Sequence, residues 1–348
     1  MALAYPGGNN TYVKDLDASG RLITEFSRNP DEFALNSYIQ LSNVQKNAGY
    51  YLKITPEEAA RVLNANLAEF VWPDGAPRPQ RNNGTETFSF QPYECQRYAF
   101  DFTIGRMASE QADWNIIESH SRIKAQQAMT ARTVKVHEML QATATYSAGH
   151  TSDVTAIPGV TGQWNLSTVA RQDIKKSLAY AVEVIMKATL SVVRRKDLQL
   201  VLSPGAAHMM SETQELVDHI KSSPDAYSQV KGDAGKWGEY GLPDRLYGID
   251  IVVEDAVQVS SKRGATLASD FICSSDQAYL LARPGSLVAE SGGPSFSSVH
   301  LFLQEDMTVE TKDNADDRRT EGRVVDNYDV VSTAPASAFR FTDINSTI

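Results

Sequence analysis

Residues 85–148 decide the fold, and they read TETFSF QPYECQRYAF DFTIGRMASE QADWNIIESH SRIKAQQAMT ARTVKVHEML QATATYSA. In the first part, large apolar side chains recur at every second position, a period that is typical of a half-buried β-strand. From Arg106 to Ala148 the stretch contains neither glycine nor proline, so we expect a helix there. The alternating residues are Phe88 and Phe90, followed by Tyr98, Phe100, Phe102 and Ile104.

The expected helix covers residues 108–143 and carries a narrow stripe of mostly small side chains. They recur every three or four residues, which keeps them on one side of a helix. A helix of about 35 residues would be about 50 Å long, roughly three times the mean for globular domains. This length suits an elongated plate and indicates a building block. The stripe consists of Trp114, Ile117, Ser121, Ala125, Met129, Thr133, Val136 and Leu140.

Composition places the chain among ordinary soluble proteins. Its 348 residues, 42% hydrophobic and 22% charged, are enough for one large core or two of moderate size. The sequence has no apolar run long enough for a membrane helix and no signal-peptide pattern, so we expect a cytoplasmic protein without a membrane partner. Cys95 and Cys273 lack metal-type spacing, and we expect no disulfide. A net charge of −10 argues against a surface that grips nucleic-acid phosphates.

The N-terminal segment, residues 1–45, is polar and rich in turn residues. It is interpreted either as a loosely ordered terminus or as an arm that orders only against neighbouring subunits. The anchors of such an arm would be Phe26, Phe33, Leu35, Tyr38 and Ile39. Residues 46–69 are expected to be a short helical segment that begins at Thr55-Pro56 and leads into the next region.

Residues 70–104 predict an extended loop with a β-hairpin. Three prolines and two glycines lie within residues 72–84, which excludes a helix or a central strand there. An isolated ribbon is marginal in water, and each large apolar side chain left wet forgoes about 1.5–3 kcal/mol. Either the parent domain or another copy must cover it. The residues expected at a subunit interface are Phe26, Phe33, Tyr38, Trp72, Phe88, Phe90, Tyr93, Arg97, Tyr98 and Phe100.

The second half of the chain mixes helices and strands. A second helix, capped by Ser167 or Thr168, has the stripe Ile174, Leu178, Ala181, Ile185, Ala188 and Val192 and ends at residues 194–196. A strand at 198–202 and a helix through Met209 follow. Because the elements do not alternate as βαβ units with short loops, the expected class is α+β. The further strand candidates are 246–255, 271–273, 278–282, 299–303, 307–311 and 328–333.

We find no motif for catalysis, cofactor binding or metal binding. No glycine-rich phosphate loop or serine elbow is present. His137 lacks the second histidine of a zinc helix, because residue 141 is glutamine, and we interpret it as a surface residue. Ser203 and His208 are better explained by a turn and a helix start than by a catalytic pair. The acidic pairs Glu254-Asp255, Glu305-Asp306 and Asp316-Asp317 are interpreted as solvated charges.

Several local strings, in this order, resemble the major capsid proteins of tailed bacteriophages, which have the Hong Kong 97-type fold. The similarity covers most of the chain, and its specificity depends on the order and number of the strings, none of which is catalytic. They are residues 28–40, 49–52, 126–133, 200–208, 242–248 and 330–339.

The resemblance implies a domain layout and a role. It implies an N-terminal arm (1–45), an extended loop (70–104), a peripheral domain (105–196 and 296–348) whose spine helix is 108–143, and an axial domain (197–295). The subunits would form hexamers and pentamers of an icosahedral shell around double-stranded DNA. The implied partners are other copies of the chain and scaffolding, portal and decoration proteins, with assembly in the host cytoplasm and a place in the virion.

Two alternatives stay open at this point. The same fold could form an encapsulin-like compartment that holds protein cargo. The chain could instead be a soluble hydrolase of unknown type, which would show a deep pocket with converging titratable groups.

Overall fold

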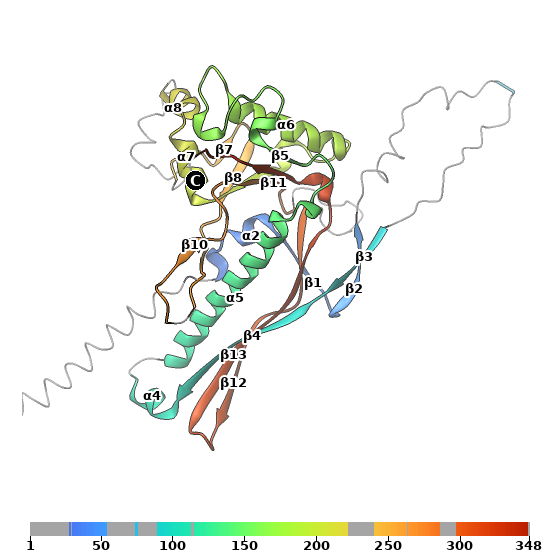
Figure 1. Ribbon diagram of the computed structural model, residues 1–348. Helices are drawn as coiled ribbons and strands as arrows, with labels where there is room; N and C mark the ends of the chain where they lie inside the picture. The colour runs from blue at the N-terminus through green and yellow to red at the C-terminus, as the bar shows by residue number, and fades with distance from the viewer. Residues whose placement is uncertain are drawn as a thin grey trace, which may run out of the picture.

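The computed structural model describes residues 28, 30–53, 74–75, 89–112, 115–221, 240–262, 264–285 and 297–346. These residues form a six-stranded sheet, a four-stranded sheet and two two-stranded ribbons. Figure 1 shows the six-stranded sheet and its helices at one end of the molecule, and the four-stranded sheet extending from it beside helix α5. This combination of helices and mixed sheets confirms the predicted α+β class.

The four-stranded sheet is built around one long hairpin. Its order is β1-β12-β13-β4, with β1 parallel to β12 and the other neighbours antiparallel. The register of the hairpin shifts between Leu303 and Thr308, and such irregularities bend a ladder without ending it. The separate strands predicted at 299–303, 307–311 and 328–333 are therefore parts of two long strands. The strands are β1 (Gln40–Asn43), β12 (Val299–Asn314), β13 (Arg319–Ser332) and β4 (Gln96–Gly105).

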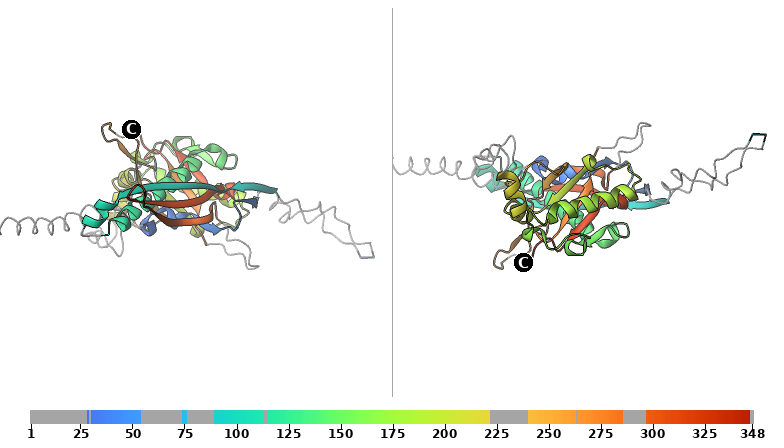
Figure 2. Two further views of the ribbon diagram at one scale, coloured as in Figure 1. Left: turned by 90° about the horizontal axis from the view of Figure 1, so that it is seen from below. Right: turned by 90° about the horizontal axis from the view of Figure 1, so that it is seen from above.

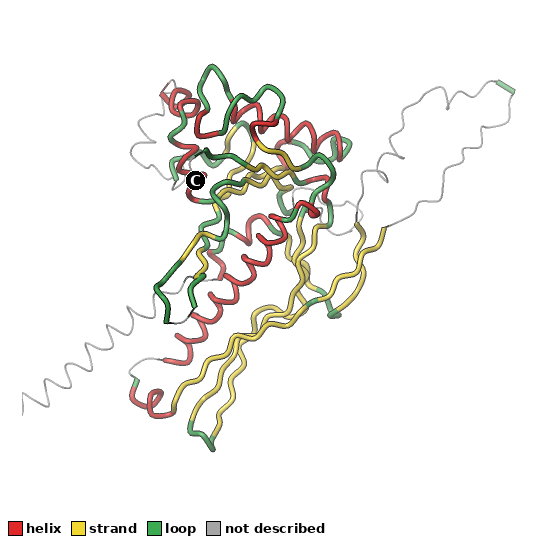
Figure 3. The backbone as a smooth tube through the Cα atoms, viewed as in Figure 1, coloured by secondary structure: helices red, strands yellow, loops and turns green. Residues whose placement is uncertain are grey.

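Helix α5 (Ile116–Gln141) lies along the four-stranded sheet, as Figure 3 shows, and contacts β13 and β4. Its 26 residues correspond to about 39 Å. The stripe predicted from the sequence is buried at Met129, Thr133, Val136 and Leu140.

The helix predicted over 108–143 begins later than expected. A separate short helix, α4 (Arg106–Gln111), precedes α5. Ala112 has an extended backbone, and the side chain of Asn115 accepts a hydrogen bond from the Glu118 N–H at 3.2 Å. Because this contact caps the first turn of α5, an uninterrupted helix from Arg106 is wrong even though no glycine or proline divides the segment.

A two-stranded ribbon extends the long sheet. It consists of β2 (Ala48–Lys53) and β3 (Ser89–Glu94), and β3 continues the line of β4 past Cys95 (Figures 1 and 2). We expected residues 70–104 to contain a hairpin, but β3 pairs with β2 and β4 pairs with β13. Alternation of side chains predicts a strand without naming its partner. The helix expected to begin at Thr55 lies outside the described residues.

The six-stranded sheet is mixed, in the order β5-β14-β11-β6-β8-β7. All five residues of β6 and all five of β11 are buried, because both faces of the sheet are covered. Residues 198–202 and 278–282 were predicted as strands, and this is confirmed. The strands are β5 (Thr151–Asp153), β14 (Phe339–Thr342), β11 (Ala278–Ala282), β6 (Leu198–Leu202), β8 (Ile249–Val253) and β7 (Arg245–Leu246).

One face of this sheet packs against helices α6 (Asp173–Ala188), α7 (Pro204–Ser211) and α8 (Gln214–Lys221). The same core includes Trp164, Ile174 and Phe341. Segments 154–185 and 339–344, which we expected in the peripheral domain, therefore pack with the six-stranded sheet. Sequence order alone does not show this, because β14 returns to the sheet from the far end of the chain.

Helix α6 is shorter than predicted at both ends. Gln172 has a φ of 51°, so the helix begins at Asp173 rather than directly after Ser167 or Thr168. The Ser167 hydroxyl still accepts a hydrogen bond from the Asp173 N–H at 2.9 Å. At the other end, Leu190 and Ser191 have positive φ values of 52° and 63°. This turn leaves Val192 53% exposed and buries Val193 in its place.

The opposite face of the sheet forms a second core with α5, the long hairpin and the described part of the N-terminal segment. Helix α2 (Leu35–Tyr38) and β1 belong to this part. Phe33, Leu35, Tyr38 and Ile39 are each at most 4% exposed within their own chain. The expectation that they order only against a neighbouring subunit is therefore wrong, since the chain's own core supplies their partners. Phe26 lies outside the described residues.

Strand β11 links the two cores. Leu280 belongs to the core on the helix-covered face, and its neighbours Tyr279 and Leu281 belong to the core shared with α5. Successive side chains of a strand point to opposite faces, so the six-stranded sheet separates the two cores.

No helix in the described part of the chain has both the length and the apolar character that crossing a membrane requires.

Candidate subunit-interaction surfaces

The ribbon of β2 and β3 has one face that is packed and one that is exposed. Directly opposed residues share a face, which places Gly49, Tyr51 and Tyr93 on one side and Tyr50 and Phe90 on the other. Tyr51 and Tyr93 lie against the ring of Phe302 on β12, with centroid distances of 5.8 and 4.7 Å. Tyr50 is 76% exposed and Phe90 is 61% exposed. The outer face thus offers two aromatic rings to solvent.

Gly49 allows the packed face to form. A Cβ atom at this position would lie 2.7 Å from the Tyr93 hydroxyl oxygen and 2.8 Å from a ring carbon of the same residue. The Tyr93 ring therefore crosses the backbone of β2 where no side chain is present. This close approach fixes which face of the ribbon turns towards Phe302.

Strand β4 turns its aromatic residues towards α5. Tyr98, Phe100, Phe102 and Ile104 share one face, as their spacing predicts. Lys135 of α5 donates a hydrogen bond to the Tyr98 hydroxyl at 2.6 Å. Phe102 stacks on His120 of the same helix with a centroid distance of 6.1 Å. Of the β4 residues predicted at an interface, Tyr98 and Phe100 therefore lie on the face that packs inside the chain.

The predicted interface residues divide into four groups. Phe33 and Tyr38 are buried in the chain's own core, which corrects their assignment. Tyr93, Tyr98 and Phe100 are half-buried on inward faces. Phe90 is exposed, as is Arg97, whose guanidinium lies 3.7 Å from the Glu305 carboxylate. The remaining three, which lie outside the described residues, are Phe26, Trp72 and Phe88.

A second exposed apolar face was not predicted. It belongs to the ribbon of β9 (Val257–Val259) and β10 (Ser269–Phe271), beside the end of β8. Val257 pairs with Phe271, and Val259 shares their face. These three side chains are 45%, 48% and 61% exposed, and Leu267 in the connecting loop is 74% exposed. In the sequence, the alternation of Val257 and Val259 around Gln258 was the pattern that could have predicted this face.

A buried polar network joins three distant segments. The Tyr38 hydroxyl donates to the Glu254 carboxylate at 2.8 Å and lies 3.0 Å from His137 Nε2. Because the Tyr38 hydroxyl donates its hydrogen to Glu254, it can only accept a hydrogen bond from His137. The Nε2 atom of His137 therefore carries the hydrogen, and its Nδ1 atom is an acceptor. Among the described residues, no group donates a hydrogen bond to Nδ1. His137 and Glu254 were both predicted at the surface, and both are at most 1% exposed, because their partners lie 99 and 216 residues away in the sequence.

Burial sets the ionisation of this network. It lowers the pKa of His137 to about 4, so the imidazole is neutral at pH 7. It raises the pKa of Glu254, an effect that the hydrogen bonds from Tyr38 and the Ala256 N–H oppose. It also raises the pKa of the nearby Cys273 thiol to about 12. A neutral histidine and an unreactive thiol that solvent does not reach favour a structural role for the network.

The Arg132 guanidinium attaches α5 to the long sheet. It donates to both carboxylate oxygens of Asp326 on β13, at 2.7 and 3.1 Å, and to Asp306 at 3.0 Å. Arg132 is 2% exposed and Asp326 is fully buried. Two parallel hydrogen bonds of this kind fix orientation as well as distance. The helix and the sheet are therefore held at one rotation.

The segments that suggested enzyme chemistry have simpler explanations. The Ser203 side chain caps α7 by accepting from the Ala206 N–H at 3.1 Å, as the turn interpretation predicts. His208 is exposed and lies 3.4 Å from Glu212 on the same helix. The described residues contain no cluster of side chains suited to a metal ion.

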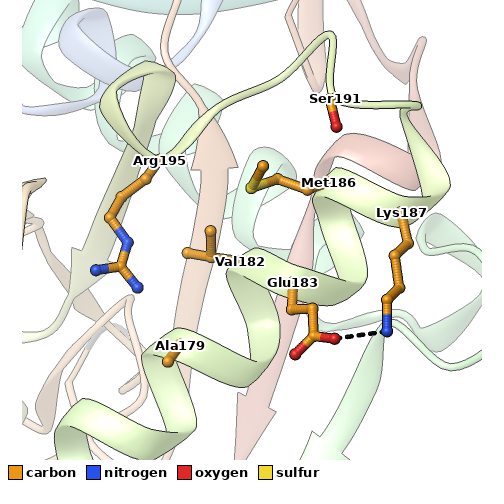
Figure 4. A pocket seen from close by; sticks show the side chains of 7 residues that line it. All are labelled: Ala179, Val182, Glu183, Met186, Lys187, Ser191 and Arg195. Atoms are coloured by element: carbon orange, nitrogen blue, oxygen red, sulfur yellow. Dashed lines mark ion pairs between the residues drawn. The ribbon is translucent and has the colours of Figure 1, made fainter.

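A pocket of about 480 Å³ lies beside α6, and Figure 4 shows its lining. Its base is apolar, at Ala179, Val182 and Met186, and an ion pair between Glu183 and Lys187 lies on one side. The two charged side chains neutralise one another on the exposed surface of the helix. Ser191 and Arg195 complete the lining, and the Arg195 guanidinium donates a hydrogen bond to the Tyr247 carbonyl at 3.3 Å.

No protein-family model and no curated protein matches the sequence. Among solved structures, the chain is similar to a phage-related protein from Bordetella bronchiseptica RB50, with 14% identity, a TM-score of 0.61, and coverage of 93% of this chain and 96% of that chain. It is also similar to the capsid of cyanophage P-SCSP1u, with 9% identity, a TM-score of 0.55, and coverage of 90% and 89%.

These similarities extend over nearly the whole length of each chain, so they concern the complete architecture. They confirm the fold that the resemblance in the sequence implied, the Hong Kong 97-type α+β fold of phage capsid proteins. At such low sequence identity, these matches show a similarity of fold alone.

Proposed function

We propose that this chain is a major capsid protein, a structural subunit that assembles into hexamers and pentamers of an icosahedral shell around double-stranded DNA. The observation that carries the proposal is the match to a cyanophage capsid over 90% of this chain. The protein would act without catalysis and without a cofactor.

The exposed aromatic face of the β2–β3 ribbon supports this proposal. Tyr50 and Phe90 project from a ribbon that extends away from both cores (Figures 1 and 2). Apolar faces of this kind on an extended element are typical of interaction sites. We assign Phe90, Arg97 and Tyr50 to contacts with a neighbouring copy. Many such contacts of moderate area become jointly strong in a closed shell.

The two sheets support a proposal for the layout of the subunit in the shell. We assign the four-stranded sheet and α5 to the peripheral part of a capsomer and the six-stranded sheet with its helices to the axial part. The net charge of −10 suits a container, because a strongly basic wall would bind DNA and hinder its movement. Scaffolding, portal and decoration proteins would be partners during assembly in the host cytoplasm.

Electron microscopy of the purified recombinant protein tests the proposal. We expect rings of five and six subunits or closed shells of uniform diameter. A population of single, separate subunits at high concentration would contradict it. The protein can also be expressed together with the other virion genes. Particles that then contain a co-purified enzyme and no nucleic acid would favour an encapsulin-like role instead.

A further inference from the structure

The apolar face of the β9–β10 ribbon has no cover in the described part of the chain. Val257, Val259, Phe271 and Leu267 present between 45% and 74% of their surface to solvent. The adjacent Ala256 and Ile272, which point the other way, are buried in the core shared with α5. The chain is therefore anchored in a core directly before β9 and directly after β10, while the ribbon carries an exposed apolar face, which is typical of a docking surface.

The chain enters the described structure next to this ribbon. Arg28 lies 2.6 Å from the carboxylate of Asp255, two residues before the start of β9. The N–H of Arg28 donates to the Gln126 side chain of α5 at 3.2 Å, and its guanidinium lies over the Phe33 ring at 5.0 Å. Arg28 is thus held from three sides, and the 27 residues before it start from a fixed point at the edge of the apolar face.

We propose that residues 22–27 of the same chain cover the apolar face of the β9–β10 ribbon. This segment, Leu22-Ile23-Thr24-Glu25-Phe26-Ser27, contains three large apolar side chains directly before Arg28. Its contacts would be those of Leu22, Ile23 and Phe26 with Val257, Val259 and Phe271. In this arrangement Phe26 acts on its own subunit, in contrast to the interface with a neighbour that we expected from the sequence.

The reach of the segment fits the size of the ribbon. Phe26 is two residues from Arg28 and Leu22 is six, which corresponds to about 7 and 20 Å of extended chain. Strand β9 has three residues, about 10 Å. A tether this short gives an effective concentration in the millimolar range, so the chain's own segment has the advantage over a neighbouring copy.

Limited proteolysis measures the docking directly. Trypsin cleaves after Arg21, next to the proposed contact, and intact mass reports the loss of residues 1–21. We expect Val259→Asp to raise this cleavage rate roughly tenfold, because losing one large apolar contact is worth at least that factor. Val309→Asp is the matched control, since Val309 is similarly exposed, at 51%, but lies on the long β12–β13 hairpin. Equal cleavage rates in the two variants would overturn the proposal.

A cysteine pair distinguishes the chain's own segment from that of a neighbour. Phe26→Cys combined with Val257→Cys should oxidise to a bond within one chain, which migrates as a monomer in a denaturing, non-reducing gel. The native Cys95 and Cys273 are buried and do not compete. Covalent dimers and larger ladders would overturn the proposal in favour of a second copy, and so would a complete absence of oxidation. Both readouts are independent of whether shells form.

Discussion

Two segments of this chain, residues 33–39 and the β2–β3 ribbon, are both rich in aromatic residues. They differ in whether those side chains are buried or exposed. Phe33 and Tyr38 lie in a core between α5 and the six-stranded sheet. Within the described residues, Tyr51 and Tyr93 pack one face of the β2–β3 ribbon, and Tyr50 and Phe90 lie on its other face, 76% and 61% exposed. The difference is the presence of a third layer of structure. In the described part of the chain, aromatic residues are buried where such a layer is present and are exposed on the outer face of the ribbon.

The largest expected effect comes from Tyr38, in the buried segment. Tyr38→Ala should lower the free energy of unfolding of the subunit by about 4 kcal/mol, since it opens a cavity and leaves Glu254 without its hydroxyl donor. Tyr50→Ala is the matched variant on the ribbon and should change it by less than about 0.5 kcal/mol. Urea denaturation of unassembled subunits measures both. Similar losses of unfolding free energy in the two variants would show that the two segments do not differ in their contribution to subunit stability.

Acid should weaken the same buried segment. The pKa of His137 is about 4 in the folded chain and 6.5 in the unfolded one, so the unfolded state binds more protons between these values. The contribution of His137 to stability is complete above pH 6.5 and is lost as the pH falls towards 4, by about 3 kcal/mol. Glu254, whose pKa is raised by burial, acts in the opposite direction. Denaturation curves at several pH values should show that the free energy of unfolding of His137→Leu depends less on pH than that of the unaltered chain. The same pH dependence in both proteins would contradict the lowered pKa of His137.

A smaller and more selective effect separates Phe90 from Phe100. Phe100 shares the face of β4 that packs on α5, so Phe100→Asp should destabilise the isolated subunit by about 2 kcal/mol. Phe90→Asp should change subunit stability by less than about 0.5 kcal/mol and yet prevent particle formation. Denaturation of subunits and microscopy of particles provide the two readouts. Normal particles from Phe90→Asp would show that the outer face of the ribbon is not an assembly contact.

Local patterns in the sequence predicted the elements better than their partners. The period of two at residues 98–104 and the stripe from Met129 to Leu140 each identify a strand or helix and its inward face, and both agree with the structure. The Ser203 cap is equally local, since its partner is three residues away. Pairing is not local, and so the partner of β3 was missed.

Buried polar groups were the other limit of prediction. His137 and Glu254 look like surface residues in their own segments, because only the fold brings Tyr38 to both of them. The apolar face of the β9–β10 ribbon had a signal in Val257 and Val259, but three residues are too few to distinguish an exposed ribbon from a core strand. The interface assignment was similarly limited, since composition does not distinguish aromatic residues with a third layer from those without one.

The sharing of β11 between two cores has a mechanical consequence. Because adjacent side chains of one strand belong to different cores, neither core can slide or rotate against the other without breaking both. We therefore expect the described sheet at the middle of the subunit to move as one body. If the subunit forms the proposed shell, we expect changes of shell curvature to involve bending of the end of the β12–β13 hairpin and of the β2–β3 ribbon.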